Sequence, residues 1–337
     1  METTYLIATV IKIVTILLVF SALAGLGTYF ERKVLAFMQR RLGPMNVGPY
    51  GIAQVAADGI KLFTKEDIVP TNVVQKIFKI APVITAATAF MAAAAIPFMP
   101  SFEIGGYTVN PIVADINVGI LYVLAVMAVG FYGPLLGGMA SANKYSLLSA
   151  ARGAAVFISY EVITGLSLLA PLMMVGSFSL IDLNNFQTTG IMFNGEHFGG
   201  MWMVVYQPVA MVLFLIAGFA ETGRTPFHLV ANDHEIIDGF GTEYSGMRWG
   251  LFFIGEYANM FFYAFLISIL FFGGFGDGSI FGAFALLGKV SFFFFFFLWT
   301  RAAWPDVRPD QLMWLCWKVL MPLAVINILI TGFVMMF

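Results

Sequence analysis

Long apolar stretches alternate along the chain with shorter polar joints. A helix that crosses the hydrocarbon core of a bilayer needs about 20 consecutive apolar residues. The pattern predicts eight transmembrane helices, near residues 5–29, 77–99, 116–139, 153–175, 202–220, 250–272, 284–303 and 315–336. The expected fold class is an all-α polytopic membrane protein, a single membrane domain over residues 1–337 with amphipathic or interfacial helices in its longer joints.

Basic residues are divided unequally between the two sets of joints. The joints after the second, fourth and sixth stretches (100–115, 176–201 and 273–283) contain five acidic residues and no Lys or Arg. The other joints contain most of the Lys and Arg residues of the chain. Because basic joints stay on the cytoplasmic side, loops 30–76 and 221–249 are predicted to be cytoplasmic and both termini to lie outside.

The first cytoplasmic loop is too long for a simple turn. Within residues 51–63, apolar and polar residues alternate roughly with a helical period: Ile52, Val55, Ile60 and Phe63 against Gln54, Asp58 and Lys61. This alternation predicts a short amphipathic helix at the membrane interface.

The second cytoplasmic loop is the most polar stretch of the chain, and it is either a solvated loop or a polar lining folded against the membrane domain. Thr225 suits a helix N-cap, Pro226 the first helical position and Gly239 the C-terminal stop, so a helix is expected between them. On that helix Glu235 and Asp238 share a face, and Asp233 points elsewhere. The pair is either a proton-exchanging site, since like charges raise carboxyl pKa values, or an ordinary solvated helix face.

The composition supports a membrane protein and limits its chemistry. Hydrophobic residues make up 60% of the chain and charged residues 11%, against about 25% charged in soluble domains. The single cysteine, Cys316, excludes a disulfide framework and a cysteine-ligated iron–sulfur cluster within this chain. The three histidines lack the spacing of a membrane haem, and no phosphate-binding glycine motif occurs. We therefore expect the chain to bind no cofactor and no nucleic acid, and to handle protons and an apolar ligand.

Ionisable residues inside apolar stretches are the strongest candidates for function, because each costs several kcal/mol in hydrocarbon unless it is paired or solvated. Glu161 lies within the fourth stretch, Glu256 within the sixth, and Glu221 closes the fifth. For Glu161 and Glu256 a proton-relay role competes with that of a buried carboxyl satisfied by its neighbours.

Several long motifs make the chain resemble a known family. They are ERKVLAFMQRRLGPMNVGPYG (31–51), ADGIKLFTKED (57–67), NKYSLLSAARGAAVFISYE (143–161), AETGRTPF (220–227), GTEYSGM (241–247), GEYANM (255–260) and RPDQLMWLCWKVLMPL (308–323). Together they resemble the family that contains the H subunit of bacterial NADH:quinone oxidoreductase, respiratory complex I, and mitochondrial NADH dehydrogenase subunit 1. The sequence is most similar in appearance to members from Campylobacter- and Helicobacter-type bacteria.

The resemblance implies that the chain is one membrane subunit of a larger redox-driven proton pump. It also implies that the chain alone is not catalytic. It implies partners, namely hydrophilic iron–sulfur and quinone-site subunits that hold FMN and the clusters, and adjacent small membrane subunits. It also implies quinone as substrate, contact with membrane lipid, and a location in the bacterial inner membrane, or the mitochondrial inner membrane if the chain is organellar.

The resemblance also assigns residues to two functions. The quinone chamber and its entrance are matched by Arg32, Arg40, Arg41, Ala53, Ala57, Asp58 and Phe227. The proton path that starts at the chamber is matched by Glu161, Glu221, Asp233, Glu235, Glu243 and Glu256.

The second cytoplasmic loop departs from the usual family pattern, ETNRAPFDLPEAE. Gly223, His228, Val230 and Ala231 stand where the family has Asn, Asp, Pro and Glu. Two family acids are therefore absent. Because residues 231, 235 and 238 share one face of a helix, Asp238 could replace the carboxylate missing at Ala231, or the proton path could be weakened.

Two other functions remain possible from the sequence. One is the homologous membrane subunit of a hydrogenase-type or other donor-linked complex, which would need no quinone. The other is a free-standing ion carrier, but carriers often contain internal repeats, and none is found in this chain.

Overall fold

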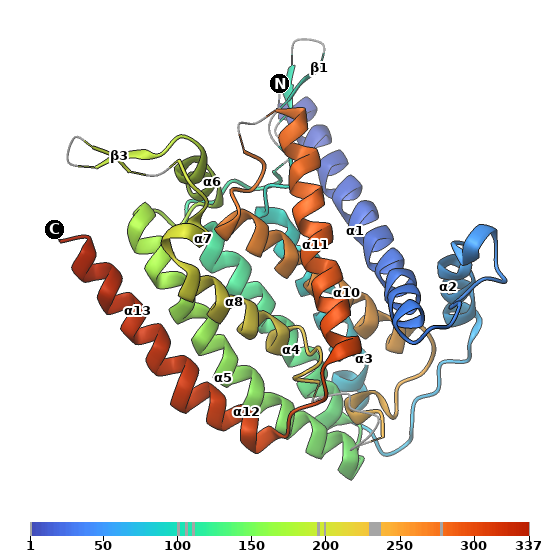
Figure 1. Ribbon diagram of the computed structural model, residues 1–337. Coiled ribbons are helices and arrows are strands. Elements are labelled where there is room, and N and C mark those ends of the chain that lie inside the picture. The colour runs from blue at the N-terminus through green and yellow to red at the C-terminus, as the bar shows by residue number, and fades with distance from the viewer. Residues whose placement is uncertain are drawn as a thin grey trace.

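The computed structural model describes residues 2–99, 102–104, 107–109, 112–193, 196–198, 200–228, 237–276 and 279–336. Within these ranges, seven helices are long and apolar enough to cross a membrane. They form the bundle in Figure 1 and are α1 (Glu2–Met38), α3 (Gln75–Ala92), α4 (Gly119–Ala140), α5 (Lys144–Val175), α10 (Gly246–Phe271), α11 (Ile280–Ala303) and one continuous helix made of α12 (Pro309–Leu315), the π-helical turn η4 (Cys316–Leu320) and α13 (Met321–Val334). The chain is thus a helical, multi-pass membrane protein, as the apolar pattern predicts.

The fifth predicted span, 202–220, is not one continuous helix. It consists of α7 (Met203–Tyr206), a break at Gln207, and α8 (Pro208–Glu221). Pro208 lacks the N–H that a continuous helix would need. The break is stabilised by the Gln207 side chain, whose amide nitrogen donates to Thr331 Oγ1 (2.8 Å) and whose oxygen accepts from Asn327 Nδ2 (2.9 Å). The 14 residues of α8 rise about 21 Å, less than the roughly 30 Å hydrocarbon core.

α10 lies in the middle of the bundle. Its second half, from Tyr257 to Phe271, is buried at almost every position, which requires a helix that is apolar on all sides. It contacts α1, α3, α8 and α11, and Phe261 stacks on Phe294 of α11 with ring centroids 4.1 Å apart. Polar residues on α10 are therefore placed where several helices meet.

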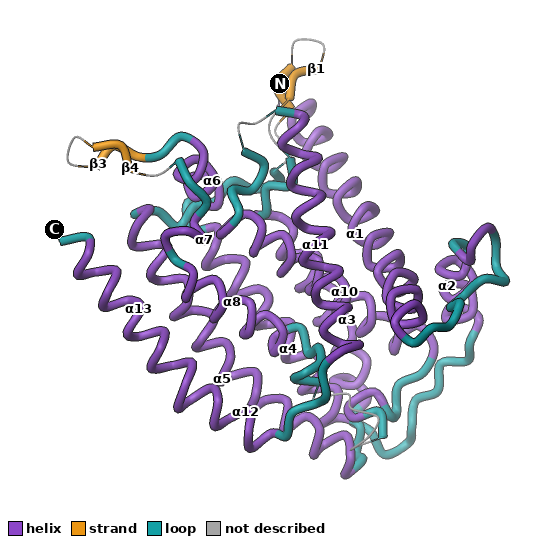
Figure 2. Tube along the Cα trace, in the orientation of Figure 1, coloured by secondary structure: helices purple, strands orange, loops and turns teal. Residues whose placement is uncertain are grey.

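The two ends of the bundle carry different structures. Two short antiparallel hairpins, β1 (Phe102–Ile104) with β2 (Tyr107–Val109) and β3 (Ile191–Phe193) with β4 (Glu196–Phe198), lie toward the same end as both termini in Figure 2. The short helix α6 (Leu180–Thr188) is at that end too. The joints without Lys or Arg are therefore gathered at one end, which agrees with the charge pattern.

The first long loop begins later than the sequence suggests. α1 continues to Met38, so Glu31 and Arg32 are helical residues. The amphipathic helix is confirmed as α2 (Gln54–Thr64), preceded by the short helical turn η1 (Pro49–Gly51). Two of its apolar side chains are strongly exposed, Ile60 at 65% and Phe63 at 73%. Figure 1 shows α2 beside the lower end of α1, and α2 also contacts α10.

The prediction of a helix from Thr225 to Gly239 is wrong at both ends. Thr225 and Pro226 lie in a turn closed by a hydrogen bond from Phe227 N to Arg224 O (2.8 Å), and the Pro226 carbonyl accepts from Val307 N (3.0 Å). At the other end Ile237 has a left-handed φ of 58°, and Asp238 (φ −107°, ψ 17°) precedes the short turn η3 (Gly239–Gly241). Asp238 is therefore not part of a regular helix that continues through Ile237. Residues 229–236 lie outside the described ranges.

Candidate functional site

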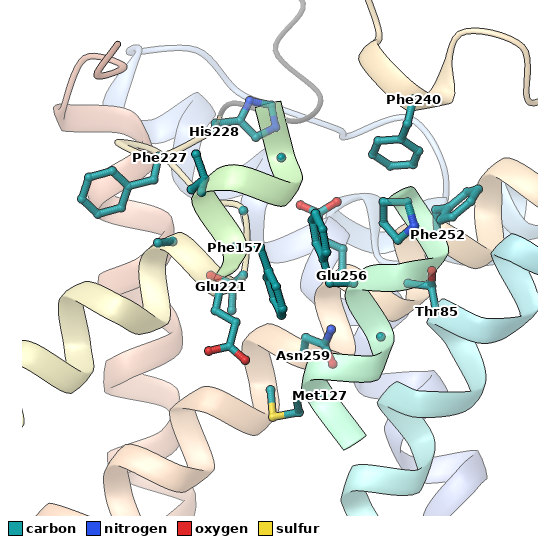
Figure 3. A pocket seen from close by; sticks show the side chains of 18 residues that line it. Thr85, Met127, Phe157, Glu221, Phe227, His228, Phe240, Phe252, Glu256 and Asn259 are labelled. Carbon is teal, nitrogen blue, oxygen red and sulfur yellow. The ribbon is translucent and has the colours of Figure 1, made fainter. Parts of the chain in front are cut away.

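A cavity lies between helices at the level where α8 ends. Its walls come from α3, α4, α5, α8, α10 and the loop residues that follow α8 and precede α10. The volume of the cavity that is open to the centres of water-sized molecules is about 100 Å³. Figure 3 shows that most of its wall is apolar, with Phe157 and Met127 among the lining side chains, while Glu221, Glu256 and Asn259 supply polar groups.

Close packing of α4 against α3 forms one wall of the cavity. Gly130 and Gly133 of α4 line it together with Thr85 of α3. A Cβ atom built on Gly130 would lie 2.8 Å from Thr88 Oγ1, and one on Gly133 would collide with Thr85. Small residues allow transmembrane helices to approach this closely. This wall therefore depends on glycine at both positions.

Glu221 is the last residue of α8 and faces the cavity. Its Oε2 accepts hydrogen bonds from Tyr263 Oη of α10 and from Thr164 Oγ1 of α5 (3.2 Å). The chain then turns at Gly223 (φ 62°), where Gly223 N donates to Ala220 O (3.2 Å). Hydroxyl groups both donate and accept, so this environment can accommodate a carboxylate and a carboxylic acid.

Glu161, in the middle of α5, is an exposed residue of this chain. It lies three residues before Thr164, the α5 residue that binds Glu221, although Glu161 does not line the cavity. A carboxylate on a membrane-spanning helix is costly where it faces lipid. The outer face of α5 at Glu161 is therefore suited to contact with another polypeptide or with water.

A network of buried charges lies next to the cavity. Glu31 of α1, 5% exposed, accepts from Tyr257 Oη (2.6 Å), from Arg224 Nη1 (3.0 Å) and from Arg301 of α11. Arg224, 2% exposed, also forms an ion pair with Glu256 Oε1 (3.0 Å), and its guanidinium lies 4.6 Å from the centroid of the Tyr257 ring. Buried charges are stable only when paired in this way.

The Arg224 guanidinium is held in its charged form. Burial by itself lowers the pKa of this group, but the Glu256 and Glu31 carboxylates outweigh burial and raise the pKa above its ordinary value. Arg224 is therefore a permanent cation between two carboxylates. It links the network to the cavity, because Glu256 belongs to both.

The remaining predicted proton-path residues are only partly placed. Asp233 and Glu235, like Ala231, lie outside the described ranges. Asp238 accepts from Trp249 Nε1 (3.3 Å), and Glu243 accepts from Asn143 Nδ2 (2.8 Å) at the start of α5. Neither Asp238 nor Glu243 lines the cavity. His228 does line it, so one of the family departures falls in its wall.

The predicted quinone-chamber residues fall into three places. Arg32 Nη1 pairs with Asp58 Oδ2 (2.6 Å), which joins α1 to α2, where Ala57 is half-buried and Ala53 is exposed. Arg40 and Arg41 are exposed beyond the end of α1, and Arg41 Nε donates a hydrogen bond to Gln39 Oε1 (2.7 Å). Phe227 is buried and lines the central cavity, and its ring centroid lies 5.4 Å from that of Tyr160.

Several residues of the site were missed by the sequence argument. Glu31, Arg224 and Arg301 were used at most as markers of topology, and Tyr257, Tyr263 and Asn259 received no role. One signal was available, because Glu256, Asn259 and Tyr263 are spaced i, i+3 and i+7 and so share a face of α10. Across the described ranges, no group of three or more His, Cys, Asp or Glu side chains is placed to hold a metal ion.

Comparisons with known proteins agree with this architecture. The family model described as NADH dehydrogenase matches residues 11–332. The chain is 78% identical over 336 residues to the H subunit of NADH-quinone oxidoreductase from Sulfurimonas denitrificans, with 100% of both chains covered. It is 67% identical to the protein of the same name from a Nitratiruptor species (99% of both chains) and 58% identical to that from Helicobacter hepaticus (98% of both chains). The chain belongs to the NADH dehydrogenase family.

Proposed function

We propose that this chain is the membrane subunit of a proton-pumping NADH:quinone oxidoreductase, respiratory complex I, and that its cavity is the start of the proton path. The names of its full-length relatives support the quinone enzyme over a hydrogenase-type complex. The enzyme activity belongs to the assembled complex, in which partner subunits hold FMN and the iron–sulfur clusters and this chain helps to house the quinone.

The cavity between Glu256 and Glu221 is the observation that carries the proton-path proposal. Glu256 is joined to the buried charges through Arg224, and Glu221 is held by the hydroxyl groups of Tyr263 and Thr164. A carboxyl whose partners are hydroxyl groups can gain or lose a proton without leaving a charged partner unpaired, because hydroxyl groups are neutral and both donate and accept. Quinone chemistry on the loop side would deliver or withdraw protons at Glu256, and Glu221 would pass them into the bundle.

Replacement of Glu221 by Gln tests this proposal in the assembled complex. Gln keeps the size and most hydrogen bonds of Glu but cannot carry a proton. We expect normal amounts of complex and normal transfer from the donor to an artificial acceptor, with quinone reduction and proton pumping lowered about 100-fold, the lower range for loss of a proton-transfer group. Normal quinone reduction with normal pumping in Glu221→Gln would exclude Glu221 from the path.

Glu161 is proposed to be the exit of the path toward a neighbouring small membrane subunit. It is exposed in the middle of α5, three residues before Thr164, which binds Glu221. A polar or titratable group of the neighbour would complete its environment, since lipid would not. Glu161→Gln should lower proton pumping while the complex still assembles, and pumping at the normal ratio to quinone reduction would place Glu161 outside the path.

The entrance of the quinone chamber is proposed to lie between α1 and α2. The Arg32–Asp58 ion pair (2.6 Å) joins the two helices, and the exposed apolar side chains of α2 suit a position at the lipid interface. A bulky residue at Ala57 should then slow quinone reduction but leave transfer to an artificial acceptor intact. Unchanged quinone turnover in Ala57→Trp would place the entrance elsewhere.

We also infer eight crossings of the inner membrane, with both termini outside. α7 and α8 together would complete the fifth crossing around the Gln207 break, and both termini lie toward the hairpin end of the bundle. The absence of Lys and Arg from the joints at that end supports an outside position. A cysteine introduced at the exposed Thr189 should be labelled from the outside, and labelling from the cytoplasmic side alone would reverse the topology.

A further inference from the structure

Asn259 occupies the middle of the polar stripe along α10. Glu256, Asn259 and Tyr263 share one face of the helix, and both Glu256 and Asn259 line the cavity. In Figure 3 the Asn259 amide lies below Glu256, with Glu221 across the cavity. Tyr263, one turn further along α10, is the hydroxyl donor of Glu221. Asn259 therefore lies between the two carboxylates of the proposed path.

The two carboxylates are held apart by their own partners. Glu256 is bound to Arg224 (Nη2–Oε1 3.0 Å) at one end of the stripe. Glu221 is bound to Tyr263 and Thr164 at the other. Seven residues along an α-helix span about 10 Å, whereas direct proton transfer needs heavy atoms about 2.6–3.2 Å apart. A proton can pass from one carboxyl to the other only through an intermediate group.

The Asn259 side-chain oxygen has an unused hydrogen-bonding capacity. It is buried and accepts no hydrogen bond from any group in the described ranges. A buried acceptor without a partner costs about 1–3 kcal/mol, so such atoms bind water when a cavity offers the room. A single water needs only about 10–15 Å³ measured in the same way as the roughly 100 Å³ of this cavity.

We propose that Asn259 positions a water molecule that carries protons between Glu256 and Glu221. The proposal rests on the proton path proposed above. The O–H bond of the Glu256 carboxylic acid breaks as a new O–H bond forms at the water oxygen. One of the water's own O–H bonds breaks as an O–H bond forms at the Glu221 carboxylate. The amide of Asn259 does not titrate at any stage. It accepts from the water and fixes its position, and is thus a positioning residue.

Three variants of the assembled complex test this role. Asn259→Leu keeps approximate size but removes the amide, and Asn259→Ser restores a group that can hold water. Met127→Leu is the matched control, because it changes the apolar wall of the same cavity and keeps Asn259. For each variant, three quantities are measured: transfer from the donor to an artificial acceptor, quinone reduction, and the ratio of quinone reduction rates in H₂O and D₂O.

We expect Asn259→Leu to reduce quinones at least about tenfold more slowly, which corresponds to roughly 1.4 kcal/mol on the limiting barrier. Its H₂O/D₂O ratio should rise, transfer to the artificial acceptor should be unchanged, and Asn259→Ser should recover most of the rate. The proposal is overturned if Asn259→Leu is normal, if its isotope ratio is unchanged, or if Asn259→Ser is as slow as Asn259→Leu. Glu221→Gln is measured in parallel: a slow Glu221→Gln with a normal Asn259→Leu rejects only the water, whereas a normal Glu221→Gln rejects the path itself.

Discussion

Two glutamates near the same cavity, the buried Glu31 and the half-buried Glu221, have opposite surroundings. Glu31 is bound by two guanidinium groups, from Arg224 and Arg301, and by the Tyr257 hydroxyl. Glu221 is bound by two hydroxyl groups, and no ion pair reaches it within the described ranges. Two guanidinium groups together hold the Glu31 carboxylate in its charged form, while the hydroxyl partners of Glu221 tolerate both forms. The same type of side chain is thus a fixed charge in one place and, in the proposed path, a proton carrier in the other.

The fixed charge of Glu31 also joins separate parts of the chain. Its partners come from the loop after α8, from α10 and from α11, while Glu31 itself belongs to α1. Removal of one member leaves the others as unpaired buried charges, which is more costly than the loss of one contact. The Glu31 site should therefore control stability, and the Glu221 site should control the rate of proton transfer.

The largest effect is expected from Arg224→Met. The variant leaves the Glu31 and Glu256 carboxylates with one cation fewer. Loss of one partner of a buried ion pair lowers the free energy of unfolding by about 3–5 kcal/mol. The chain should then be degraded or absent from the complex, as measured by its amount in purified membranes. The matched control is Arg248→Met, which loses a more exposed ion pair with Asp67 (2.9 Å; 21% and 43% exposed). The control should lower the free energy of unfolding by less than about 1 kcal/mol. An equal loss of the chain from membranes in both variants would contradict a special role for Arg224.

A smaller loss of stability is expected from Glu31→Gln. Gln can still accept a hydrogen bond but no longer neutralises the guanidinium groups, so the loss should be about 1.5–3 kcal/mol, the range for hydrogen bonds to charged groups. The temperature that half-inactivates the complex should fall by several degrees, while activity per assembled complex stays close to normal. If Glu31→Gln instead matches Glu221→Gln, with normal stability and slow quinone reduction, the two sites do not differ as described.

The smallest and sharpest contrast is between two tyrosines of α10. Tyr263→Phe removes one hydroxyl from Glu221, and Tyr257→Phe removes one from Glu31. One hydrogen bond is worth about 1 kcal/mol, so Tyr263→Phe should slow quinone reduction roughly fivefold and alter its pH dependence. Tyr257→Phe should lower the inactivation temperature but keep the pH dependence of the normal complex. Indistinguishable pH profiles in the two variants would remove the distinction between the carboxylates.

Parts of the candidate site could be found from the sequence and parts could not. Glu161, Glu221 and Glu256 were identified because a carboxylate in an apolar stretch is unusual at any position. Asp238 was misplaced because its expected helix requires regular backbone up to Gly239, whereas Ile237 adopts a left-handed φ of 58°. The Gln207 break was also missed, since its partners Asn327 and Thr331 lie more than a hundred residues further along the chain.

The sequence by itself determined the membrane class, the approximate positions of the apolar helices, the division of basic residues between the two ends, and the family. These properties are sums over neighbouring residues, because the hydrophobic free energy of a stretch depends mainly on its own composition. Only the tertiary structure decided which charges meet. Arg224 and Glu31 are separated by 193 residues, and their pairing, like the cavity between Glu256 and Glu221, exists only because α1, α5, α8, α10 and α11 pack around one low-dielectric interior where a buried charge must find a partner.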